Sequence, residues 1–195
     1  MALSVFGTYF PEYSYLKDTM STLGSSVSPV SDQISLWWII LGVLFIFFGT
    51  GFQMKFSAKG KYSKFASGLI ILYGIGEGIG SGVFKADRIA NGLTTSGIIH
   101  EILGSIGIIS ILLLPLVMQK LITKKENPLF FLISQIVLIS GIFFVILFLF
   151  RYSNGDNFFA IYKGLWQRLL ILNSYIYLLI IAIQMIKSTN DKKQP

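Results

Sequence analysis

The chain of 195 residues has no cysteine, a single histidine and few charged residues. Without cysteine it can form no disulfide and offers no thiolate nucleophile. The single histidine, His100, excludes a metal site built from several histidines. Charged residues make up 13% of the chain, compared with about a quarter of a typical soluble domain. This shortage of charge excludes an ordinary soluble globular domain.

Hydrophobic residues are abundant instead, at 53% of the chain, and the mean hydropathy is +0.70. The charges are segregated, which leaves continuous apolar runs of about 20 residues, the length that crosses a bilayer as a helix. Continuous runs argue against a transmembrane β-barrel, in which apolar and polar residues alternate. We therefore predict an all-α fold, a polytopic membrane helical bundle with about five transmembrane helices.

The apolar runs divide the chain into three parts. Residues 1–33 are rich in Tyr, Ser and Thr, contain no run long enough to cross a bilayer, and are expected to form a short extracytoplasmic segment. Residues 187–195 are expected to be a cytoplasmic tail. Between these parts, the transmembrane bundle covers residues 34–186, with spans at about 34–54, 65–84, 97–118, 128–150 and 165–186.

The net charge of +7 is explained by membrane topology and lipid headgroups, and we expect membrane lipids but no nucleic acid as partners. If the connections alternate between the two sides, ten of the 16 basic residues lie on one side and six on the other. The positive-inside rule places the richer side in the cytoplasm. We therefore expect a multi-pass protein whose amino terminus is outside and whose carboxy terminus is cytoplasmic.

The second expected span contains glycines at four-residue spacing, Gly74, Gly78 and Gly82. On a regular helix these glycines share one face, and small residues allow another helix to approach closely. We predict that this face packs against a helix, and an oligomer formed through it is one expectation.

Ionisable side chains inside hydrocarbon are costly and usually face a protein interior or a wet cavity. Glu77 lies seven residues before the outer end of the second span, roughly 10 Å deep at about 1.5 Å per residue. Other polar residues gather toward the same side, and we predict a cavity open to the extracytoplasmic side. The candidate ligand-binding residues are Asp18, Ser21, Glu77, Asp87, His100, Glu101, Gln167, Arg168 and Asn173.

Structural roles compete with this interpretation for most candidates. Arg168 is as well explained by an ion pair that holds the fifth span to the second or third. His100 can simply bond a loop or a headgroup, and Glu101 points about 100° away from it on a helix. Asp87 in a polar connection is often merely solvated. Glu77 is the hardest to explain structurally, because its neighbours are glycines, and it is either paired with a cation such as Arg168 or uncharged. The residues assign no catalytic group, cofactor or metal site.

Three segments carry a resemblance to a known family. They are YSYLKDTMSTLGSSVSP (13–29), GVFKADRIANGLTTSGIIHEILG (82–104) and GLWQRLLILNSYIYLLIIAIQ (164–184). They resemble the Tyr-Ser-x-Leu-x-Asp-x-x-Ser-x-Leu-Gly, Gly-x-Phe-x-x-Asp and Gly-Leu-x-Gln-Arg segments of the bacterial and archaeal membrane proteins catalogued as domain of unknown function 998.

The resemblance implies a location in a prokaryotic plasma or inner membrane but supplies no activity. It also implies a further helix before the Tyr-Ser segment, which we do not expect in this chain. The polar positions that it implies as recurrent are Asp18, Ser21, Asp87, His100, Gln167 and Arg168.

Three functions are compatible with this pattern. In the first, which we favour, the protein binds or transports a small polar or amphiphilic molecule that meets Glu77, His100 and Arg168. In the second it is an intramembrane lipid hydrolase or transferase, with a site formed by Asp18, Ser21, Asp87 and His100. Such a site would be similar to membrane hydrolases of the ceramidase and adiponectin-receptor type, which use zinc held by three histidines, so carboxylates would have to complete it here. In the third, the protein is a structural or partner subunit of a membrane complex.

Overall fold

The computed structural model describes residues 2–89, 92–152 and 157–190. Of the predicted tail, residues 191–195 lie outside the described residues. Within these ranges, five helical segments are long and apolar enough to cross a membrane, which confirms the predicted all-α polytopic bundle. They are α3 (Ser31–Lys55), the segment Lys61–Val83, α6 (Thr95–Leu121), α7 (Pro128–Leu149) and α9 (Lys163–Asn190).

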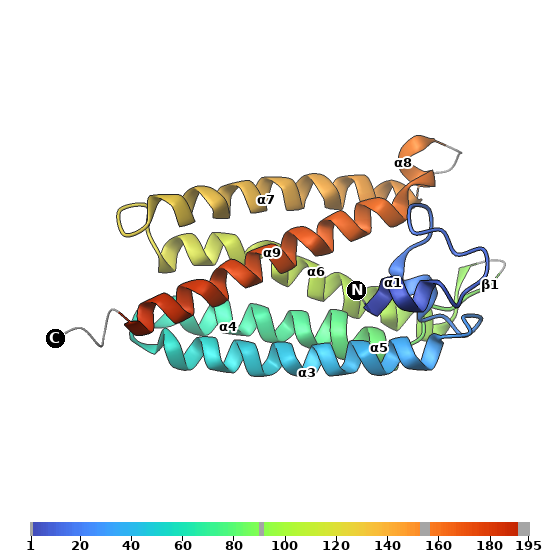
Figure 1. Cartoon of the computed structure of the whole chain (residues 1–195), viewed down its shortest axis with the longest axis horizontal. Helices are drawn as coiled ribbons and strands as arrows, with labels where there is room; N and C mark the ends of the chain where they lie inside the picture. The colour runs from blue at the N-terminus through green and yellow to red at the C-terminus, as the bar shows by residue number, and fades with distance from the viewer. Residues whose placement is uncertain (1, 90–91, 153–156, 191–195) are drawn as a thin grey trace.

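The long helices lie side by side along the long axis of the molecule, and short elements cover the two ends (Figure 1). At one end lie α1 (Ala2–Gly7), α2 (Met20–Leu23), the antiparallel strands β1 (Arg88–Ile89) and β2 (Gly92–Leu93), η3 (Phe150–Tyr152) and α8 (Phe158–Ile161). We call this the cap end. The opposite end carries the 3-10 turn η1 (Ser57–Lys59) and the carboxy terminus, and we call it the basic end.

Two long helices begin at side-chain caps that the sequence supplies. The Thr94 hydroxyl accepts a hydrogen bond from the Gly97 N–H at 3.0 Å, and the Asn127 side-chain oxygen accepts one from the Phe130 N–H at 3.0 Å. Each cap satisfies one of the amide groups that lack partners in the first turn. Pro115 does not end α6, which continues to Leu121, because the freed backbone groups of a membrane helix can be satisfied locally.

The second membrane-spanning segment is not a regular α-helix. The helix α4 (Lys61–Tyr73) continues as a π-helix, η2 (Gly74–Gly80), before the short helix α5 (Ser81–Val83). The sequence predicts a helix here, and the structure adds that part of it is a π-helix. π-helical turns are rare and often occur at functional sites.

The glycines of η2 and α5 allow two other helices to approach the backbone. A Cβ at Gly78 would lie 2.4 Å from the Gly42 Cα of α3, and one at Gly76 would lie 2.4 Å from the Leu103 carbonyl oxygen of α6. Gly74 and Gly82 also face α3. The helix that packs on the predicted glycine face therefore belongs to the same chain. An oligomer through these glycines stays a prediction, and a second chain could reach them only by displacing α3.

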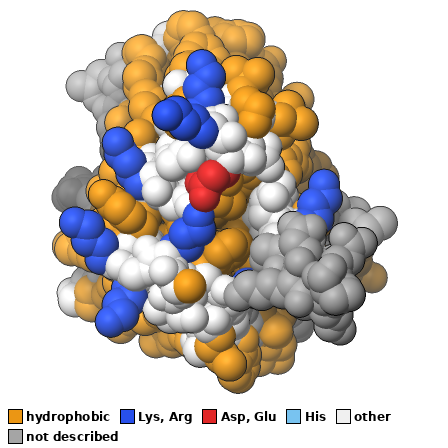
Figure 2. All heavy atoms as spheres, turned by 90° about the vertical axis from the view of Figure 1, so that its left-hand side faces the viewer, with side chains coloured by type: hydrophobic (Ala, Val, Ile, Leu, Met, Phe, Trp, Pro, Cys, Tyr) orange, Lys and Arg blue, Asp and Glu red, His pale blue; other side chains and the backbone are white. Residues whose placement is uncertain are grey.

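Apolar side chains fill the half of the bundle nearest the basic end. This core includes Phe52 from α3, Tyr73 from α4, Met118 from α6, Phe130 from α7 and Tyr177 from α9, all of them fully or almost fully buried. Figure 2, which looks onto the basic end, shows Lys and Arg side chains spread over its surface. The exposed lysines of this end include Lys59, Lys61, Lys64, Lys120 and Lys124. The orientation of the chain in a membrane stays a prediction.

Candidate functional site

A cavity of about 470 Å³ lies in the half of the bundle nearest the cap end. Its wall comes from α3, the α4–η2–α5 segment, α6, α7 and α9, together with residues of the amino-terminal segment. The lining is mostly apolar and includes the aromatic side chains of Trp37, Trp38, Phe45, Phe148 and Tyr175. Five of the nine candidate residues line this cavity, namely Ser21, Glu77, His100, Glu101 and Gln167.

Glu77 comes from the middle of η2, between glycines that pack on α3 and α6. Glu77 as a residue is partly buried, and it lines the cavity. Gly104 on α6 leaves it room, since a Cβ there would lie 3.1 Å from Glu77 Oε2. Among the described residues the carboxyl group accepts no hydrogen bond and forms no ion pair, although the charges of Arg151 and Glu101 act on it. The pair with Arg168, one of the two alternatives for Glu77, does not form, because Arg168 has other partners.

His100 lies in the second turn of α6, and its ring is buried. Its Nδ1 lies 2.8 Å from the backbone carbonyl oxygen of Phe84. A carbonyl oxygen can only accept, so Nδ1 carries the proton and, in the neutral ring, Nε2 is the acceptor. The ring also lies 6.4 Å from that of Trp38, measured between centroids. The structure thus contains the predicted bond to a loop and also brings the ring to the cavity wall.

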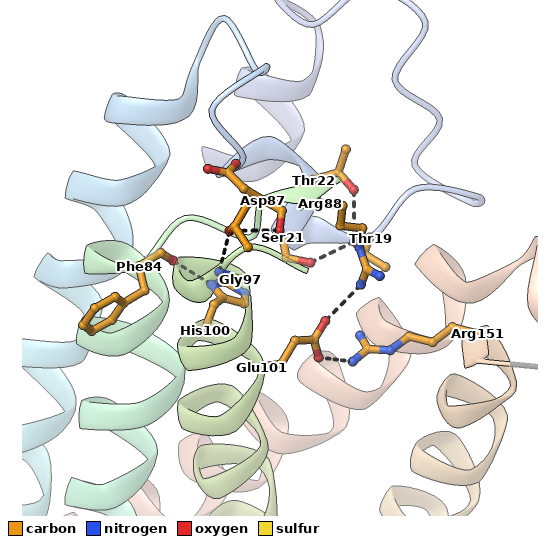
Figure 3. Close-up of polar contacts among 11 residues, drawn as sticks. Thr19, Ser21, Thr22, Phe84, Asp87, Arg88, Gly97, His100, Glu101 and Arg151 are labelled. Atoms are coloured by element: carbon orange, nitrogen blue, oxygen red, sulfur yellow. Dashed lines mark hydrogen bonds and ion pairs between the residues drawn. The ribbon is translucent and has the colours of Figure 1, made fainter. Parts of the chain in front are cut away.

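Glu101 lies between two arginines at the cap end of the cavity (Figure 3). Its Oε1 accepts from Arg88 Nη2 at 3.0 Å, and its Oε2 accepts from Arg151 Nη2 at 2.5 Å. Arg88 belongs to β1 and Arg151 to η3, so this carboxylate joins three elements. Arg151 is packed over the Phe148 ring at 4.0 Å, and its side chain is 12% exposed.

Sequence reasoning missed Arg151 as a residue of this site. It was assigned to a connection, because it is the first charged residue after the long apolar run 128–150. One signal was available: Glu101 begins the third span at the same membrane depth at which Arg151 ends the fourth. Opposite charges at equal depth on sequential, antiparallel helices are candidates for an ion pair.

Gln167 and Ser21 line the cavity where the amino-terminal segment covers it. The side-chain oxygen of Gln167 accepts a hydrogen bond from the Met20 N–H at 2.6 Å, which fixes the start of α2 against α9. The Ser21 hydroxyl lies 2.9 Å from that of Thr19. Residues of the amino-terminal segment therefore form part of the cavity wall.

Arg168 does not line the cavity and instead holds the amino-terminal segment. Its Nη1 donates to the backbone oxygens of Asp18 and Gly164, each at 2.9 Å, and its Nη2 donates to the Tyr13 hydroxyl. The Asp18 carboxylate accepts from the Ser14 N–H at 2.8 Å. Burial raises the pKa of Tyr13, and the Arg168 guanidinium opposes this shift.

The two remaining candidates also have structural partners. Asp87 accepts hydrogen bonds from the backbone N–H and the hydroxyl of Ser26, at 2.7 and 2.6 Å, so it ties the loop before β1 to the amino-terminal segment. Asn173 on α9 donates to the Val137 carbonyl oxygen of α7 at 3.0 Å. Asn173 thus holds two helices together.

The four residues of the hydrolase hypothesis do not all line the cavity. Ser21 and His100 line the cavity, whereas Asp18 and Asp87 accept hydrogen bonds elsewhere in the cap. In the described part of the chain, no group of three or more histidine, cysteine or acidic side chains is placed to hold a metal ion.

Comparison with known proteins gives one match. The family model described as "Protein of unknown function (DUF998)" matches residues 1–184. No curated protein and no solved structure matches the chain. Because the family model covers most of the chain, and because the expected membrane helices are present, the resemblance noted in the sequence is confirmed. The chain belongs to the DUF998 family of membrane-spanning proteins of unknown function.

Proposed function

We propose that this membrane protein binds a small amphiphilic molecule in the cavity between α3, η2, α6, α7 and α9. The observation that carries the proposal is the combination of an apolar, aromatic wall with two polar groups that have no hydrogen-bond partner among the described residues. These are the Glu77 carboxyl group and His100 Nε2. Ligand sites are typically apolar clefts with a few polar groups that fix orientation.

The size of the cavity agrees with this proposal. Small-molecule sites have volumes of about 300–1,000 Å³, and the cavity measures about 470 Å³. An apolar chain would lie along Trp37, Trp38 and Phe148, and a polar head group would reach Glu77 or His100.

The packing favours binding over passage across the membrane. The half of the bundle near the basic end is filled by the core that contains Phe52, Met118 and Tyr177. A ligand in the cavity would have to separate these side chains to reach the basic end. Interiors packed in this way open only at considerable cost, so transport would require a second conformation of the bundle.

Quenching of tryptophan fluorescence tests the proposal directly. Trp37 and Trp38 line the cavity, and Trp166 is the third tryptophan of the chain. In a Trp166→Phe background, a bromine-labelled single-chain amphiphile should quench the remaining fluorescence saturably. The protein would be purified and reconstituted in lipid nanodiscs.

A pair of neighbouring substitutions on α9 provides the control. Ile171 lines the cavity and is 9% exposed, whereas Leu172 is 54% exposed. Ile171→Phe should weaken saturable quenching by roughly tenfold, equivalent to about 1.4 kcal/mol, and Leu172→Phe should not. Quenching that does not saturate, or that is equal in both variants while both retain their helical circular dichroism, would overturn the proposal.

A further inference from the structure

The carboxylates of the cavity differ in how the protein satisfies them. Glu101 forms ion pairs with both Arg88 and Arg151. Glu77 lies deeper, within η2, and its carboxyl group has neither a hydrogen bond nor an ion pair among the described residues. A carboxylate inside a largely apolar cavity normally needs a hydrogen-bonding or cationic partner. Of these two carboxyl groups, Glu77 is therefore the one that still lacks a hydrogen-bond donor or a cation among the described residues.

Aromatic rings line the cavity together with Glu77. The Phe45 and Tyr73 rings meet edge to face with centroids 5.0 Å apart, and the Tyr175 ring lies 5.8 Å from that of Phe45. All three residues line the cavity with Glu77. Aromatic faces attract cations, especially where water is excluded. A carboxyl group beside several aromatic rings has the chemistry of a site for an organic cation.

An anionic head group would fit this cavity poorly. Among the described residues of its wall, the one Lys or Arg is Arg151, and Glu101 is already bonded to it at 2.5 Å. An anion placed deeper would approach the Glu77 carboxyl group. A neutral hydroxyl could donate to Glu77, but a hydrogen bond between two charged groups is roughly twice as strong as a neutral one.

We infer that the amphiphile bound in this cavity carries a cationic amine that pairs with Glu77, with its apolar part along the aromatic wall. This inference rests on the proposed function. It assigns Glu77 as the residue that determines head-group specificity, and it assigns Gly104 as the position that leaves room for the head group, because a Cβ there would lie 3.1 Å from Glu77 Oε2.

The test compares three probes with the same twelve-carbon chain: dodecylamine, dodecanol and dodecanoate. Each is titrated against the bromine-labelled amphiphile on the reconstituted full chain at pH 7, and its concentration is expressed as mole fraction in the nanodisc lipid. Dodecylamine should compete at a concentration at least roughly tenfold lower than dodecanol, equivalent to about 1.4 kcal/mol. Dodecanoate should be the weakest competitor.

Two substitutions separate the head-group effect from general changes. Glu77→Gln keeps the shape of the side chain and should abolish the preference for the amine, while dodecanol should still compete. Glu126→Gln removes a carboxylate at the basic end, outside the lining of the cavity, and should keep the preference. Saturable competition by dodecanol also shows that the Glu77→Gln cavity is intact.

The outcomes distinguish this inference from the proposed function. Equal competition by amine and alcohol in the unmodified chain, or an amine preference that persists in Glu77→Gln, overturns the inference while binding of an amphiphile stands. If none of the three probes competes and quenching does not saturate, the proposed function itself fails.

Discussion

Arg168 joins the amino-terminal segment to the membrane helices through a single side chain. It donates to the backbone oxygens of Asp18 and Gly164 and to the Tyr13 hydroxyl, and its guanidinium carbon lies 5.7 and 5.6 Å from the Tyr13 and Tyr15 rings. A planar guanidinium can make these contacts together, whereas an ammonium group cannot. The positive charge is therefore used to hold a cap in place.

Loss of Arg168 should release this cap while the helices persist. Arg168→Ala removes hydrogen bonds from a charged donor, each worth about 1.5–3 kcal/mol, so hydrogen exchange in residues 13–24 should become faster. Trypsin should cleave after Lys17, which is exposed, at an increased rate. Arg168→Lys should show most of the same effect.

The neighbouring cation Lys163, at the start of α9, provides the matched control. Lys163→Ala should leave both exchange and cleavage unchanged. Protection of residues 13–24 in Arg168→Ala equal to that of the unmodified chain would show that other contacts, such as the Leu165 N–H to Leu16 carbonyl bond of 2.9 Å, hold the cap alone.

At the scale of elements, the helices could be predicted from the sequence, and the local geometry of η2 could not. Apolar runs of sufficient length must satisfy their backbone groups internally, so a helix follows directly. The stretch Gly74–Gly80 fits an α-helix and a π-helix equally well by composition. The π-helix occurs where Gly42 of α3 and Leu103 of α6 approach the backbone closely. These contacts join segments that are distant in sequence, so the sequence of the stretch alone does not reveal them.

The candidate site could be predicted in part for the same reason. Depth along each span placed Glu77, His100 and Glu101 at one end of the bundle, and all three line the cavity. The partner of Arg168 could not be found from charge patterns, because the guanidinium bonds backbone oxygens and a phenol. Backbone acceptors leave no signature in the sequence.

The packing of η2 against α6 predicts the effect of adding one methyl group. A Cβ at Gly76 would lie 2.4 Å from the Leu103 carbonyl oxygen and 2.9 Å from the Gly107 nitrogen, and both are backbone atoms that cannot rotate away. Gly76→Ala should therefore lower the thermal midpoint of unfolding, with a loss of about 1–3 kcal/mol. Circular dichroism or fluorescence of the purified protein during heating measures this change.

The same substitution at an open position is the control for Gly76→Ala. A Cβ at Gly51 of α3 would meet nothing within 4 Å, so Gly51→Ala should leave the midpoint unchanged or raise it slightly, because alanine favours the helix. Equal midpoints for the two variants would mean that α6 can move away from η2 at little cost.

An ion pair joins the two connections at the basic end. Lys59 Nζ of η1 lies 2.6 Å from Glu126 Oε1, and hydrogen bonds from Lys59 and Thr123 lower the pKa of Glu126 to about 2. Because this pKa is below its ordinary value of 4.5, the pair contributes stability above about pH 4.5. That contribution is lost as the pH falls toward 2.

Glu126→Gln should therefore have a small effect that depends on pH. Both side chains are more than a third exposed, and such pairs contribute about 0–1 kcal/mol. The variant should unfold slightly more easily than the unmodified chain at pH 7, and the difference should shrink below about pH 4.5 and vanish below about pH 2, as measured by thermal unfolding. A difference that grows as the pH falls would contradict the pairing.

At the scale of the whole molecule, the two ends differ in surface charge and in internal packing. The basic end is covered by lysines and rests on a filled core, whereas the cap end covers the cavity. Basic residues near the ends of membrane helices are retained on the cytoplasmic side during insertion. The asymmetry therefore predicts that the cap and the cavity lie on the extracytoplasmic side.

Because the chain contains no cysteine, a maleimide can react only with a cysteine that is introduced. Single introduced cysteines therefore report this orientation. Val27 in the cap is 81% exposed, and Ser57 in η1 is exposed at the basic end. A membrane-impermeant maleimide applied to intact cells should label Val27→Cys and should leave Ser57→Cys unlabelled until the membrane is permeabilised. The reverse pattern would place the cavity on the cytoplasmic side. Labelling of both positions from outside would mean that the two ends are not separated by the membrane, which would contradict a topology in which all five candidate spans of the described residues cross it.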